Sequence, residues 1–173
     1  MDFKNNFLSF LTSYWWLLLL GGYFLYTYLS QVERNNTGDV ITSGYIESVL
    51  DWEVGDCYVS ENLNEKEQSE TGGEYFVPCE QPHTHQVYKI NHSLFSTFST
   101  YPGQEIIFEE ANKFCLEGTD DLVLNSNYQE LLISLIDEGL SFEYIFPLEY
   151  SWPKYKGVIC MFSFPEEIKG SVL

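Results

Sequence analysis

The sequence is poor in basic residues: it has 8 Lys and Arg against 26 Asp and Glu, a formal net charge of -18. Such a chain repels phosphate backbones and anionic lipid surfaces, so we expect no nucleic-acid partner. An Asp-rich calcium loop is also missing. We therefore attribute the acidity mainly to a solvated surface that resists aggregation, with weak calcium or cationic-partner binding as the other interpretation.

Motifs of common enzyme classes are missing as well. The sequence has no Gly-x-Ser-x-Gly elbow, no phosphate-binding glycine loop and no internal repeat. His83 with Asp56 or Glu80 could form a base and its orienting carboxylate, but nothing supplies a third partner. We therefore expect no catalysis and no cofactor, and we keep a small-ligand or metal-assisted enzyme centred on His83 as the alternative.

Charged side chains are absent from residues 5–32, and residues 7–29 are mostly Leu, Phe, Tyr and Trp. As a helix, residues 7–29 would span roughly 34 Å, slightly more than a hydrocarbon core of about 30 Å. We predict a transmembrane signal anchor, which makes the lipid bilayer a partner. A cleaved signal peptide is the rival interpretation, but no small-x-small cleavage site follows the run. Gly21-Gly22 also offers a close-approach point for a scaffold that assembles with other membrane helices.

Composition divides the chain into four regions, and the length leaves room for one folded domain. We expect a short N-terminus with the anchor at 1–32, a polar, glycine-punctuated stalk at 33–48, the folded domain at 49–164 and a tail at 165–173.

Hydrophobic periodicity predicts an α+β domain, in which a small, mostly antiparallel sheet is packed by two helices. Apolar residues four apart predict the helices, and apolar residues that alternate with polar ones predict the strands. The predicted strands are 74–78, 86–91, 140–146 and 157–164, and the predicted helices run from 101–103 to Cys115 and over 127–138.

Four cysteines follow the apolar segment and allow three connectivities. Cys57 and Cys79 stand at the ends of short strands around an acidic loop, whereas Cys115 and Cys160 occupy core-facing positions. We predict the disulfides Cys57–Cys79 and Cys115–Cys160, with four reduced cysteines as the alternative. Such bonds need an oxidising compartment, which places the C-terminal domain of this single-pass protein outside the cytoplasm.

A zinc set of Cys57, Cys79, His83 and His85 is conceivable, but its spacing lacks a second close ligand pair, and we expect no metal. His83 follows a proline, so we predict a turn residue whose ring bonds to a backbone carbonyl or a carboxylate. We expect His85 and His92 to be exposed.

A resemblance rests on several motifs in a fixed order. They are Val54-Gly55-Asp56-Cys57, Val77-Pro78-Cys79, Pro82-His83 with Val87-Tyr88, Tyr101-Pro102-Gly103 before a helix ending in Cys115, and Pro147 with Trp152 and Cys160. Over residues 49–164 this order resembles the septum formation domain of actinobacterial envelope proteins. This chain has Gln86 where that family has Glu, and Trp152-Pro153-Lys154 where the family continues from its Trp into a Gly-Asp-Arg-like turn.

The resemblance implies an N-terminal membrane helix, an extracytoplasmic domain and a non-catalytic role linked to septum formation or cell-wall processes. It leads us to expect an envelope-protein or cell-wall partner. Within the motifs, Pro82, His83, Tyr88 and Trp152 are the candidate binding residues.

Overall fold

The computed structural model describes residues 16–17, 19–26, 31–46, 48–60, 74–117 and 139–173. The chain divides into two units, Met1–Gln31 and Val32–Leu173. In the first unit, residues 16–17 and 19–26 are helical and exposed. No helix among the described residues is long and apolar enough to cross a membrane. Residues 7–15, 18 and 27–29 of the predicted anchor lie outside the described residues, as does the predicted helix 127–138.

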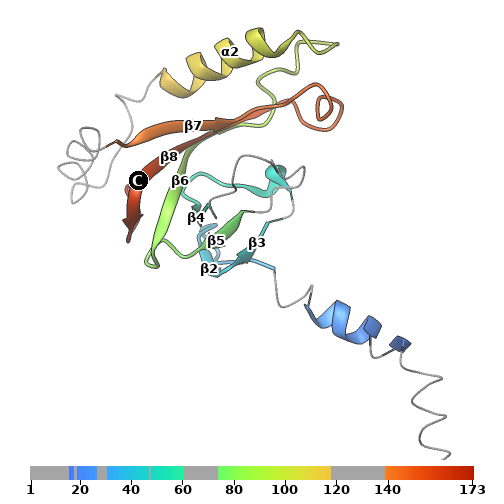
Figure 1. Ribbon diagram of the computed structural model, residues 1–173, viewed down its shortest axis with the longest axis vertical. Coiled ribbons are helices and arrows are strands. Elements are labelled where there is room, and N and C mark those ends of the chain that lie inside the picture. The colour runs from blue at the N-terminus through green and yellow to red at the C-terminus, as the bar shows by residue number, and fades with distance from the viewer. Residues whose placement is uncertain (1–15, 18, 27–30, 47, 61–73, 118–138) are drawn as a thin grey trace, which may run out of the picture. The chain divides into compact units, whose positions relative to one another are not determined.

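The second unit has an α+β fold built on antiparallel sheets, as predicted (Figure 1). Its main sheet has six strands, in the order β3 (Gly44–Tyr45), β5 (Tyr75–Val77), β4 (Cys57–Val59), β6 (His83–Asn91), β8 (Val158–Ile168) and β7 (Ser141–Ile145). A two-stranded sheet pairs β1 (Glu33–Arg34) with β2 (Val40–Thr42). Helix α2 (Gln104–Leu116) and the short 3-10 helix η1 (Val49–Asp51) complete the described elements of this unit.

Strand β8 lies between β6 and β7 and separates two hydrophobic clusters. Because successive side chains of a strand point to opposite faces, its alternating residues divide between the clusters. Val158, Cys160, Phe162 and Phe164 face one cluster, as predicted, and Ile159 and Met161 face the other.

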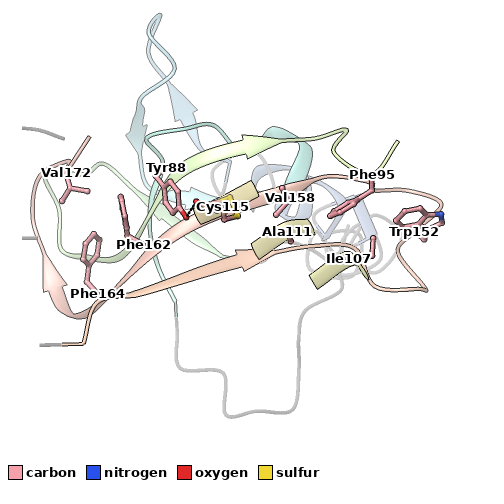
Figure 2. Close-up of a cluster of buried hydrophobic side chains, with 11 residues drawn as sticks. Tyr88, Phe95, Ile107, Ala111, Cys115, Trp152, Val158, Phe162, Phe164 and Val172 are labelled. Carbon is pink, nitrogen blue, oxygen red and sulfur yellow. Dashed lines mark hydrogen bonds between the residues drawn. A yellow bond between two sulfur atoms is a disulfide. The ribbon is translucent and has the colours of Figure 1, made fainter. Parts of the chain in front are cut away.

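The first cluster lies between the sheet and α2 (Figure 2). Helix α2 contributes Ile107, Ala111 and Cys115, which recur every four residues and therefore share one helical face. The end of the cluster near the start of α2 is formed by Phe95 and Trp152 (Figure 2).

The second cluster packs the other face of the sheet. Trp52, which follows η1, packs edge-on against Phe76 with ring centroids 4.9 Å apart, and Tyr58 lies beside both rings. Val40 and Ile46 also belong to this cluster.

The regions predicted as a stalk and a tail differ from expectation. Residues 33–46 form β1, β2 and β3, and β3 joins the main sheet. At the other end, β8 continues to Ile168, and Val172 is fully buried in the first cluster. Both segments are too short to show a periodicity, and their burial depends on partners far away in the sequence.

Candidate functional site

Both predicted disulfides are present. Cys57–Cys79 links the start of β4 to the turn after β5, with Cα atoms 5.3 Å apart, and Cys115–Cys160 links α2 to β8, with Cα atoms 5.6 Å apart. The four cysteines of the sequence are all used, and none is free. No cysteine thiolate is therefore available as a nucleophile or zinc ligand.

An ion pair lies beside the first disulfide. The carboxylate of Asp56 is 2% exposed, and Arg34 donates from Nη1 to Oδ1 at 2.5 Å and from Nη2 to Oδ2 at 2.8 Å. The backbone N–H of Glu53 also donates to Asp56 Oδ2, at 2.8 Å. The hydrogen bond to Asp56 raises the pKa of Arg34. This two-point contact ties the start of the folded unit to the turn before Cys57.

The buried amide of Gln86 ties the other end of the unit to the same turn. Gln86 Nε2 donates to the hydroxyl of Ser171 at 2.6 Å and to the carbonyl of Gly55 at 3.3 Å. Its Oε1 accepts from the backbone N–H of Val172 at 2.9 Å. In the sequence, Gln86 is notable only as a departure from the family pattern, and these contacts were not predicted, because its partners at the C-terminal end are identifiable only after folding.

His83 is fully buried at the start of β6, and its Nδ1 lies 3.0 Å from the carbonyl of Gln81. The predicted bond to a backbone carbonyl is thus confirmed, and it makes Nδ1 the protonated nitrogen. Nε2 is buried without a hydrogen-bond partner. Burial lowers the pKa of His83, which favours the neutral form of the ring in the folded protein.

The prediction that His85 is exposed is wrong, because only 8% of the residue is accessible. Its ring stacks on Tyr58 at a centroid distance of 4.7 Å, and its Nε2 lies 3.7 Å from Glu143 Oε2. The contact with His85 lowers the pKa of Glu143, whereas burial raises the pKa of nearby Glu74. No group of three metal-ligating residues is found in the part of the chain that the structure describes.

The candidate binding residues do not come together in one site. Pro82 is exposed, whereas Tyr88 is buried in the first cluster and donates from its hydroxyl to the carbonyl of Cys115 at 3.0 Å. Burial raises the pKa of Tyr88 to about 12. Trp152 is 6% exposed and lies at the other end of the cluster from Phe164, whose ring contacts His83 (Figure 2).

Beside Trp152 lies an open hollow of about 640 Å³, lined by residues 101–104 and 148–150. The first segment leads into α2 and the second follows β7 (Figure 1). The ring of Tyr101 stands edge-on to Trp152 at 5.4 Å, and Tyr150 is 58% exposed. Partial burial, and then the negative charge of Glu149, raise the pKa of Tyr101.

The backbone around this hollow is held in place by local hydrogen bonds. The hydroxyl of Ser151 accepts from the N–H of Leu148 at 2.9 Å, and the N–H of Trp152 donates to the carbonyl of Leu148 at 3.0 Å. Gly103 precedes α2 at a φ of 102°, in the region that favours glycine. The hollow is therefore built on fixed turns, next to the connection between β7 and β8 in which Trp152 lies.

Comparison with known proteins gives no match among family models, curated proteins or solved structures. The resemblance to septum formation domains therefore stays a prediction, and the function has to be argued from the geometry.

Proposed function

We propose that the chain is a membrane-anchored, single-pass envelope protein whose C-terminal domain lies outside the cytoplasm and acts as a non-catalytic binding module. The observation that carries the proposal is the use of all four cysteines in two disulfides. Disulfides of this kind persist in oxidising compartments and are rare in the cytoplasm. The resemblance to septum formation domains supports a role in septum formation or cell-wall processes.

The charge-free segment 7–29 supports the anchor, with the lipid bilayer as its partner. Because the first cysteine is residue 57, all four cysteines follow this segment and lie on one side of the bilayer. An oxidising environment for the cysteines therefore also decides the orientation of the anchor.

Binding fits the described surface better than catalysis does. His83, on which the alternative enzyme would be centred, has no exposed surface, and its Nε2 faces the protein interior. A substrate could reach it only if this end of β6 opened. The hollow beside Trp152, by contrast, is open and offers aromatic and polar side chains to a ligand.

Thiol accounting on the full chain tests the compartment. Cells that express the protein are lysed in the presence of an alkylating reagent, and the chain is analysed by intact-mass spectrometry and peptide mapping. We expect no alkylated cysteine, the bonds Cys57–Cys79 and Cys115–Cys160, and a mass that includes residues 1–32. A shorter mass would identify a cleaved signal peptide.

A matched control is a variant that lacks residues 5–32 and therefore stays in the cytoplasm. Its four cysteines should be alkylated, because the cytoplasm keeps thiols reduced. Four alkylated cysteines in the full chain would contradict the proposed orientation.

A further inference from the structure

If the proposed binding function holds, the side chains that line the hollow beside Trp152 limit the class of ligand that it can bind. Its lining residues include two tyrosines, Glu149 and Gln104, and none of the described residues that line it is basic. Tyrosine rings present a negative face, and a carboxylate accepts hydrogen bonds only. Both kinds of group attract positive charge, and the net charge of -18 adds to that attraction.

Trp152, which lies beside the hollow, already contacts a cation of the protein itself. The ammonium of Lys156 lies 4.8 Å from the centroid of the Trp152 ring and donates to the carbonyl of Phe98 at 2.8 Å. Trp152 is buried behind Tyr101, so Tyr101 is the aromatic side chain of the first cluster that lines the hollow. Lys156 is held in place by these two contacts.

We propose that this hollow binds an alkylammonium group, as carried by a lysine side chain in an exposed segment of a partner protein. Glu149 accepts the N–H groups of the ammonium, and the exposed ring of Tyr150 contributes a cation–π contact. The aliphatic stem of the lysine packs on Pro102 and Leu148. A volume of about 640 Å³ admits neighbouring residues of the partner as well.

An anion or a neutral sugar fits the hollow less well. An anion would meet Glu149 without a cationic partner among the described residues that line the hollow. A neutral sugar would gain nothing from the negative charge of Glu149 or from the net charge of -18. The charge of the hollow therefore favours the ammonium group over both.

The test measures the Kd of a tetralysine peptide with acetylated and amidated ends for the full chain in a polyoxyethylene detergent, by isothermal titration calorimetry. Removal of one partner of an exposed charge or cation–π contact weakens binding by about two- to fivefold. We expect a rise of this size in the Kd for both Glu149→Gln and Tyr150→Ala. Tyr150→Phe keeps the ring and should leave the Kd within about twofold of the wild type.

The matched control is Glu166→Gln, which removes one exposed charge near the far end of β8. It should change the Kd by less than about twofold if the hollow is the site. Equal losses for Glu149→Gln and Glu166→Gln would overturn the proposal, because they would show that the peptide binds the acidic surface diffusely. Binding of tetraglutamine with acetylated and amidated ends, or of tetra-N-acetylchitotetraose, that is equally sensitive to Glu149→Gln would also overturn it, since neither probe carries an ammonium group.

The variants address exposed side chains, so they should fold like the wild type, which thermal melting can check. The binding experiment and the thiol accounting can fail separately. If the Kd values contradict the ammonium site, the conclusion about the compartment is unchanged. If the cysteines are reduced, the Kd values still decide whether the hollow binds an ammonium group.

Discussion

The Cys115–Cys160 disulfide should contribute a large part of the stability of the folded unit. We consider Cys115→Ala/Cys160→Ala, because both residues are fully buried and alanine adds no polar group that would need a partner. The bond closes a loop with a sequence separation of 45 residues. The loop-closure estimate for that length is about 4 kcal/mol, against a typical total of about 5–15 kcal/mol for a domain.

The free energy of unfolding should therefore fall by about 4 kcal/mol, and the melting temperature by roughly 16 °C at about 4 °C per kcal/mol. Chemical denaturation of the full chain, followed by the fluorescence of Trp52 and Trp152, measures the change. Cys57→Ala/Cys79→Ala removes the bond with the shorter sequence separation of 22 residues and should cost about 3 kcal/mol. A loss below about 1 kcal/mol in the first variant would refute the reasoning, because it would mean that the unfolded chain gains little freedom when the bond is removed.

Three further changes test other parts of the structure. Arg34→Ala leaves the buried carboxylate of Asp56 unpaired and should cost about 3 kcal/mol in denaturant unfolding, whereas Glu33→Gln on the exposed neighbour should be nearly neutral. A Cβ at Gly157 would lie 2.5 Å from the Cα of His92, so Gly157→Ala should cost about 1–3 kcal/mol, and an unchanged melting temperature would contradict this packing. Because burial lowers the pKa of His83, its neutral form stabilises the fold fully above pH 6.5, and this contribution is lost as the pH falls from 6.5 towards the folded pKa. NMR titration of the His83 ring would contradict this if the ring titrates at or above 6.5.

Regular patterns within one segment were predictable from the sequence. In β8, four inward residues alternate over 158–164, and in α2 three apolar residues recur every four positions. Because the cysteines Cys115 and Cys160 occupy positions in these two patterns, their pairing could be inferred before the fold was known. The predicted helix 127–138 lies outside the described residues and stays a prediction.

The position of His85 shows why other features could not be predicted. His83 and His85 are two residues apart, and a regular strand would place both on one face. The pairing of β6 with β8 shifts register between them, so His83 reaches the ring of Phe164 and His85 stacks on Tyr58 in the opposite cluster. A β-bulge of this kind depends on the partner strand and leaves little trace in the local sequence.

The sequence by itself determined the α+β class and the inward faces of α2 and β8, because each depends on a repeated local pattern. The positions of the four cysteines relative to these elements favoured the two disulfide pairs. Only the tertiary structure decided that residues 33–46 and the C-terminal end belong to the folded unit, through the contacts Arg34–Asp56 and Gln86–Val172. It also placed Tyr101 and Glu149 on one hollow. The physical reason is that these contacts join single polar or aromatic residues from distant segments. Such residues form no periodic pattern in the sequence, so their contacts could not be predicted from it.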